Sequence, residues 1–144
     1  MERLFERLFI NGTYSGRGHW VDTKAEGEYT VEYVISGGGQ RPRLHTVKRV
    51  FLKPDGGTLY EEHSTITFDE LAQNRMRVTI GGAQGSVKGD GYWFDRLCHY
   101  EADVKEDNHL EFTFVCGTVK IEGLGSATNH GNFTAWKESV SRIN

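Results

Sequence analysis

Residues 28–36 read Glu-Tyr-Thr-Val-Glu-Tyr-Val-Ile-Ser, and this stretch decides the fold. Tyr29, Val31, Tyr33 and Ile35 form one row, and Glu28, Thr30 and Glu32 alternate with it. Successive side chains of a β-strand point to opposite faces of the sheet. The alternation therefore predicts a strand with one buried face and one face in water.

The same alternation recurs along the chain, and each run ends in glycine, Pro-Asp-Gly or Asp-Asn turn residues. Many short strands at a spacing of roughly 8–12 residues are typical of an all-β sandwich or barrel. No linker or internal repeat separates these runs. We expect about ten strands, at 12–20, 28–36, 44–53, 58–68, 75–80, 86–94, 97–104, 109–116, 119–126 and 132–138.

Length and charge narrow the class of protein. A chain of 144 residues is expected to form a single domain, residues 1–144. A net charge of −3 supplies no basic field, so we expect no nucleic-acid partner.

No apolar run approaches the ~20 residues of a membrane span. Charges in residues 1–10 interrupt any signal-peptide core, which favours a cytoplasmic location. A homodimer is compatible with these features.

The N-terminal segment has a different period. Leu4, Phe5, Leu8 and Phe9 recur at helical spacing, which predicts one or two turns of helix at the mouth of a barrel. A first strand is the alternative interpretation of this segment.

Turn chemistry sets the register of a first hairpin. Residues 53–57 suit a three-residue loop, because proline presets a type I turn and Gly56 can take the left-handed position. Counting outward places Lys48 opposite Glu62 and Arg49 opposite Glu61. Pairs of opposite charge support this register.

A second hairpin turns at residues 106–108. Its apolar rows must share one face, which places Val104 opposite Leu110 and Cys98 opposite Cys116. Two buried thiols are expected there in preference to a disulfide, because the sequence shows no secretion signal. A redox pair is not favoured, since the Cys-x-x-Cys spacing is missing.

The histidines divide into two groups. His99 and His109 fall on polar rows and are expected on the solvated surface. His45 and His63 fall on the row that holds Arg49 and Glu61, which also contains apolar residues. If that row faces inward, it can bind a polar head group; if it faces outward, it carries surface ion pairs. No metal-binding spacing is present, so we expect no metal site.

Aromatic residues dominate the predicted inner rows. A small barrel with so many inner aromatics either fills its own interior or lines a cavity for one apolar ligand. The inner aromatic residues are Tyr14, Trp20, Tyr29, Tyr33, Tyr100, Phe112 and Phe114. The predicted ligand-binding residues are Tyr14, Trp20, Tyr33, Arg49, Glu61, His63, Tyr100, Phe112 and Phe114.

Two short patches resemble a known superfamily. Residues 12–18, Gly-Thr-Tyr-Ser-Gly-Arg-Gly, are similar to the Gly-Thr-Trp-x-Gly-x-Gly opening of nitrobindin-like and fatty-acid-binding-like barrels, with Tyr14 in place of tryptophan. These barrels belong to the calycin superfamily. Residues 129–134 resemble the region in which nitrobindin-like proteins place their haem-ligating histidine. The resemblance implies an antiparallel up-and-down β-barrel of about ten strands around a ligand cavity.

We therefore expect a calycin-like barrel that binds a small, largely apolar molecule and needs no cofactor. One alternative is a haem-binding barrel that uses His130, although a structural loop histidine is favoured at that position. The other is a lipocalin-fold isomerase or lyase with His63, Glu61 and Arg49 as acid, base and anion clamp.

Overall fold

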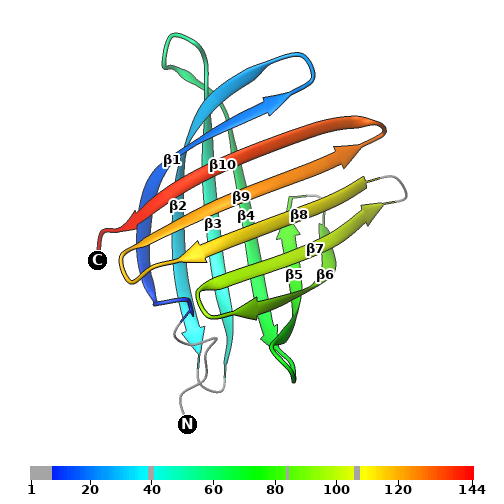
Figure 1. Ribbon diagram of the computed structural model, residues 1–144. Coiled ribbons are helices and arrows are strands. Elements are labelled where there is room, and N and C mark those ends of the chain that lie inside the picture. Colours follow the sequence, from blue (N-terminus) through cyan, green and yellow to red (C-terminus); the bar gives the residue numbers. More distant parts are fainter. Residues whose placement is uncertain (1–7, 39–40, 84, 106–107) are drawn as a thin grey trace.

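One sheet of ten antiparallel strands closes on itself to form a barrel (Figure 1). The computed structural model describes residues 8–38, 41–83, 85–105 and 108–144. The strands are β1 (Gly12–Asp22), β2 (Glu26–Gly38), β3 (Arg41–Leu52), β4 (Thr58–Glu70), β5 (Arg75–Gly82), β6 (Gly85–Phe94), β7 (Leu97–Lys105), β8 (Asn108–Cys116), β9 (Lys120–Asn129) and β10 (Asn132–Arg142).

Each strand pairs with its neighbours in the chain, and the first strand also pairs with the last. The β1–β10 ladder runs from Tyr14 opposite Arg142 to Asp22 opposite Thr134. This topology confirms the predicted all-β, antiparallel up-and-down barrel. No helix among the described residues is long and apolar enough to cross a membrane.

The predicted N-terminal helix falls mainly on residues 1–7, which lie outside the described residues. The two residues that follow, Leu8 and Phe9, are buried against the barrel core. The ring of Phe9 lies 4.4 Å from the ring of His45 and 5.1 Å from that of Phe68, centroid to centroid. These contacts cover one end of the barrel interior.

The β3–β4 register differs from the prediction by one residue. The turn itself is as expected: Lys53 N–H donates to Gly57 C=O at 2.7 Å, and Gly56 has a φ of 92°. The register then shifts between Phe51 and Leu52, so Arg49 pairs with Glu62. The predicted Arg49–Glu61 pairing is wrong, because a bulge adds one residue to β4.

The β7–β8 register differs by two residues. Ala102 pairs with Leu110 and Cys98 pairs with Phe114, because pairing continues up to the turn with a shift near Asp103. The predicted pairs Val104–Leu110 and Cys98–Cys116 are wrong. A shift of two residues keeps every side chain on its face, so the inner aromatic row is unaffected.

Both cysteines are free thiols in the barrel core, as expected. Burial raises the pKa of each, to about 12 at Cys116. Cys98 Sγ lies 3.9 Å from the sulfur of Met76. Such buried, protonated thiols act as small apolar side chains and are poor nucleophiles.

The end of the barrel near Phe9 is tightly packed with aromatic rings. Phe114 is 1% exposed and lies 6.0 Å from Phe9 and 4.4 Å from Phe112, measured between ring centroids. His45 is completely buried in this layer, 4.7 Å from the ring of Phe68. Neither nitrogen of the His45 ring has a hydrogen-bond partner among the described residues.

Burial, together with the nearby charge of Arg43, lowers the pKa of His45 to about 3. Its ordinary value is 6.5. The imidazole is therefore held neutral inside the aromatic layer, because a charged ring there would lack both water and a counter-charge.

We predict that His45 makes the protein sensitive to acid. Between pH 6.5 and about 3 the ring binds a proton in the unfolded chain, whereas in the folded chain it stays neutral. The free energy of unfolding should therefore fall with decreasing pH, by up to ~1.4 kcal/mol per pH unit from this group. In His45→Leu the loss below pH 6.5 should be smaller, as measured by urea denaturation at a series of pH values. Equal slopes for the two proteins would contradict this prediction.

Candidate functional site

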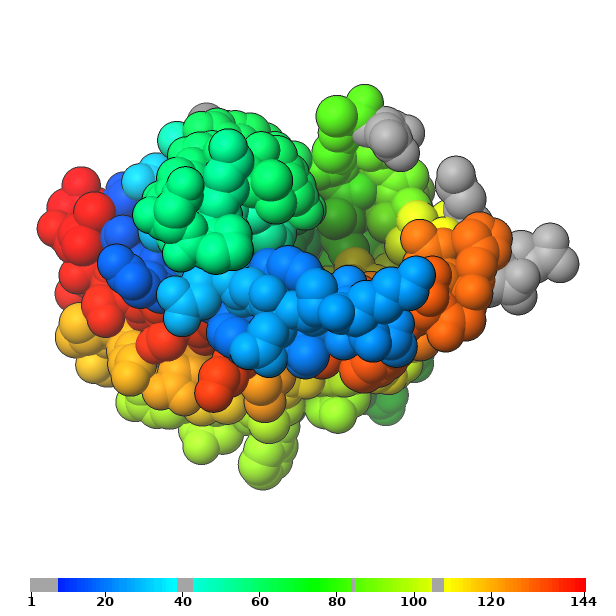
Figure 2. All heavy atoms as spheres, turned by 90° about the horizontal axis from the view of Figure 1, so that it is seen from above, coloured from blue at the N-terminus to red at the C-terminus, as the bar shows by residue number. Residues whose placement is uncertain are grey.

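A cavity of about 740 Å³ occupies the other end of the barrel. Viewed from above, a recess opens between the β3–β4 hairpin and β5–β6, bordered by the β1–β2 hairpin and by β9–β10 (Figure 2). Most of the wall is apolar. Its larger apolar members are Trp20, Phe51, Ile66, Ile80, Phe112 and Trp136.

One buried ion pair adjoins this apolar wall. Arg49 donates from Nε to Glu138 Oε1 at 2.9 Å and from Nη2 to Glu138 Oε2 at 3.1 Å. The Tyr29 hydroxyl donates to Glu138 Oε1 at 2.8 Å. The side chain of Glu138 is 1% exposed and that of Arg49 is 12% exposed. This two-bond geometry is the strongest arrangement that arginine and a carboxylate can form.

A glycine makes the tyrosine bond possible. Gly18 of β1 pairs with Tyr29 on one side and with Glu138 on the other. A Cβ atom built on Gly18 would lie 2.0 Å from Tyr29 Cζ. The tyrosine ring therefore crosses β1 over this glycine, in the space where any other residue would place its side chain.

Burial controls the protonation of this network. The pKa of Glu138 is raised to about 7, because the effect of burial exceeds that of the hydrogen bond from Tyr29, which lowers the pKa. Burial also raises the pKa of Tyr29, which keeps the phenol protonated as a donor. The Arg49 guanidinium, in contact with both carboxylate oxygens, favours the ionised form of Glu138.

The charge of Arg49 is balanced on both sides. Besides Glu138, the Glu62 carboxylate at the cavity wall approaches Arg49 Nη1 to 3.6 Å. The guanidinium carbon also lies 5.9 Å from the centre of the Phe112 ring. Two carboxylates and one aromatic face surround a single positive charge, so the cavity offers little net attraction to an anion.

Four of the predicted ligand-binding residues line the cavity: Trp20, Arg49, Tyr100 and Phe112. Of the two orientations left open for its row, Arg49 takes the inward one. Three others lie inside the barrel but outside the cavity lining, in the packed layer, each no more than 1% exposed: Tyr14, Tyr33 and Phe114.

Glu61 and His63 lie on the outer face of β4. Their side chains are 48% and 63% exposed and form a pair with each other at 3.2 Å. They do not share an inward row with Arg49, because the β4 bulge places Glu62 opposite Arg49. The isomerase or lyase alternative needs His63, Glu61 and Arg49 on one face of the barrel, and the structure does not bring them together there.

His130 lies in the turn between β9 and β10, with a φ of 50° and an exposed side chain. The cavity wall includes Asn129 and Thr134 on either side of this turn, but not His130. The haem alternative thus finds no ligand for iron at His130 within the cavity.

Sequence reasoning missed Glu138 and Trp136. Both belong to the inner row of β10, which continues to the buried Val140. The alternation Trp136-x-Glu138-x-Val140 was the available signal, because it places a carboxylate on an otherwise apolar row. A charged residue on such a row needs a buried partner.

A second hollow, of about 500 Å³, lies elsewhere, along β1 and β8–β10. Its wall carries many charged residues, including Arg17, Glu28, Lys120 and Glu122. It lacks the continuous aromatic lining of the barrel cavity. We therefore take the barrel cavity as the candidate site.

Comparison with known proteins supports the fold alone. No known protein family and no curated protein sequence matches the chain. Among solved structures, the crystal structure of Rv2717c from M. tuberculosis is similar, with a TM-score of 0.72 and 12% sequence identity. The match covers 100% of this chain and 99% of that one.

We predict that Arg49 and Glu138 stabilise the fold only as a pair. Arg49→Met leaves a buried carboxylate without its counter-charge and should cost about 3–5 kcal/mol of unfolding free energy. Glu138→Met should cost a similar amount. The double variant should lose at least ~2 kcal/mol less than the sum, in urea denaturation.

The matched control for this pair is Arg77→Met. Arg77 pairs with Asp90 at 3.5 Å, but both side chains are more than half exposed. Its removal should cost no more than about 1 kcal/mol. Additive losses at Arg49 and Glu138 would contradict the prediction.

We further predict that Gly18→Ala displaces the Tyr29 ring and breaks its bond to Glu138. Overpacking of this kind costs about 1–3 kcal/mol. Gly81→Ala is the control, because its new Cβ would meet nothing closer than 3.8 Å. Thermal denaturation of both variants gives the measurement. Equal midpoints for the two would show that Gly18 is not needed for this crossing.

Proposed function

We propose that this protein binds a small, largely apolar molecule in the open half of its barrel. The observation that carries the proposal is the cavity of about 740 Å³ with an aromatic and aliphatic wall. Pockets of roughly 300–1,000 Å³ with an apolar lining and few polar groups are typical small-molecule sites. The packed layer around Phe114 closes the barrel below this space, so a ligand would enter from the open end.

The polar groups favour an uncharged polar end on the ligand. Arg49 is neutralised by Glu138 and Glu62, and Glu138 is fully engaged by Arg49 and Tyr29. A charged ligand would have to compete with these bonds after losing its own water. A neutral hydroxyl or carbonyl could share the Arg49 Nη1 donor without breaking the Glu138 pair.

The calycin superfamily is the family that this proposal implies. Its support is the ten-stranded antiparallel barrel together with the glycine-rich opening of β1. Binding without covalent chemistry is favoured over the enzyme alternative, because His63 and Glu61 lie on the outer face. A cytoplasmic location remains part of the proposal.

Filling the cavity tests the proposal. Ala127 lines the cavity from β9, so Ala127→Phe would place a phenyl ring in the space proposed for the ligand. We expect the neutral dye Nile red to bind the unmodified protein with increased fluorescence. The variant should bind it at least about tenfold more weakly, which corresponds to ~1.4 kcal/mol.

Ala135→Phe is the matched control. Ala135 lies on β10 next to the cavity residue Thr134, and the alternation of the strand puts it on the outer face. This variant should bind the dye as the unmodified protein does. Loss of dye binding in both variants, or in neither, would place the dye outside the barrel and contradict the proposal.

A further inference from the structure

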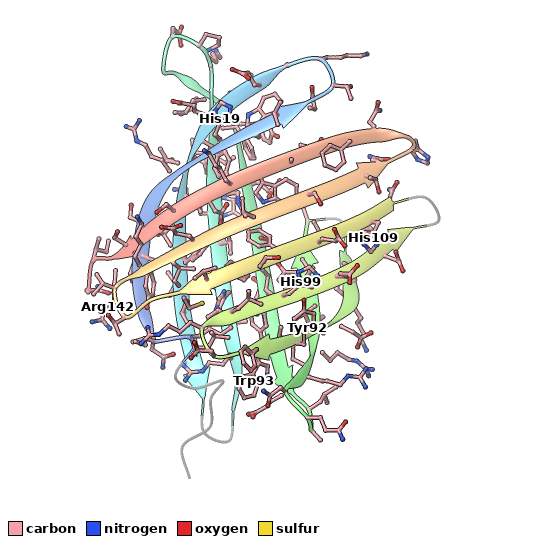
Figure 3. The ribbon with its side chains drawn as sticks, in the orientation of Figure 1. His19, Tyr92, Trp93, His99, His109 and Arg142 are labelled. Atoms are coloured by element: carbon pink, nitrogen blue, oxygen red, sulfur yellow. The ribbon has the colours of Figure 1, made fainter. Side chains whose placement is uncertain are left out.

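The outer face of β7 and β8 carries a compact group of metal-ligating side chains. In Figure 3, His99 and His109 lie on these two neighbouring strands. This face is separate from the cavity, because the alternate residues of the same strands point inward. The β7–β8 cluster consists of His99, Glu101, Asp103, His109, Glu111 and Thr113.

Strand pairing forces two carboxylates together at the centre of this cluster. Glu101 of β7 is directly opposite Glu111 of β8. On its other side Glu101 is opposite Asp90 of β6, whose carboxylate approaches Arg77 Nε to 3.5 Å. Like charges directly opposite each other destabilise a sheet. A bound cation between Glu101 and Glu111 would remove this repulsion.

Each histidine is held by a side-chain contact at Nδ1, and its Nε2 atom faces Glu101. His109 Nδ1 lies 2.8 Å from Asp103 Oδ1, and His99 Nδ1 lies 2.7 Å from Thr113 Oγ1. Metal-binding histidines almost always use their second nitrogen in this way, with a carboxylate, carbonyl or water as partner. The Nε2 atoms face the acidic pair: His109 Nε2 contacts Glu101 Oε1, and a metal ion bound there would take the place of this contact.

The potential ligand atoms of His99, Glu101 and Glu111 form one group, and His109 approaches both of its carboxylates. His109 Nε2 lies 3.1 Å from Glu101 Oε1 and 3.6 Å from Glu111 Oε1, and His99 Nε2 lies 3.6 Å from Glu101 Oε2. Ligand atoms of His99, Glu101 and Glu111 all fall within 4.8 Å of one another. Tetrahedral zinc with ligands at about 2.0–2.1 Å separates those ligands by about 3.3–3.4 Å.

We propose that His99, Glu101, His109 and Glu111 bind one divalent transition-metal ion of the Zn²⁺ type. Two imidazoles and two carboxylates form a donor set that zinc accepts in four-coordinate sites. Asp103 and Thr113 orient the two imidazoles as outer partners. The ion would join β7 to β8 on the outside of the barrel, independently of any ligand in the cavity.

The test is titration of metal-free protein with Zn²⁺ alone, by isothermal calorimetry and by thermal denaturation. We expect one ion per chain and a melting temperature that rises with Zn²⁺ concentration, because the ion binds the folded state. His109→Gln and Glu111→Gln should each weaken binding at least about tenfold. Asp103→Asn should weaken it about 10–100-fold, as loss of an outer partner does.

His63→Gln is the matched control. His63 and Glu61 form an exposed histidine–glutamate pair at 3.2 Å, and no third ligand joins them among the residues that the structure describes. This variant should bind Zn²⁺ as the unmodified protein does. The altered residues lie on the surface, and far-ultraviolet circular dichroism would verify that each variant keeps its strands.

Three results of the Zn²⁺ titrations would overturn the proposal. The first is the absence of saturable Zn²⁺ binding by the unmodified protein, which requires no variant. The second is an equal loss of affinity in His63→Gln and His109→Gln. The third is half an ion per chain, which would mean that two molecules share the metal. The visible absorption of bound Co²⁺, which is stronger for four-coordinate than for six-coordinate ions, would support the tetrahedral donor set if strong and contradict it if weak.

Discussion

Closure of the sheet by the β1–β10 ladder is the constraint on which the rest of the structure depends. It pairs the two strands that would otherwise present open edges, and it creates one inside and one outside. In every strand that alternates with a two-residue period, one row of side chains then faces the interior and the other faces outward. Glycines beside this seam allow large inner side chains to cross it: Gly18 leaves room for the ring of Tyr29, which reaches from β2 over β1 to Glu138 of β10.

The barrel interior is divided into two unlike halves. Around Phe9, His45 and Phe114 the rings fill the space, and this half supplies the apolar burial that stabilises the fold. The other half is left open as a cavity. The Arg49–Glu138 pair lies beside this cavity, where burial makes an unpaired charge costly. The packed aromatic layer and the open cavity thus lie along different lengths of the same strands.

The two faces of β7 and β8 differ in chemistry. Tyr100 and Phe112 point into the barrel and line the cavity, while Glu101 and Glu111 meet on the outside. Because neighbouring residues face opposite ways, either face can change without altering the other. The similarity to Rv2717c, with 12% identity over the whole chain, fits a barrel that is defined by its alternation and closure.

The sequence by itself determined which residues face inward wherever the two-residue period was unbroken, so Tyr100 and Phe112 were placed correctly despite a register error of two residues. It did not determine which residues contact each other across strands. The extra residue in β4 turned Glu61 outward and brought Glu62 to Arg49, and only barrel closure joined Arg49 to Glu138, 89 residues away. The same register decided that Glu101 meets Glu111. The face to which a side chain points follows from local backbone geometry. The residue that it contacts on another strand depends on every bulge and turn between the two residues and on how the sheet closes.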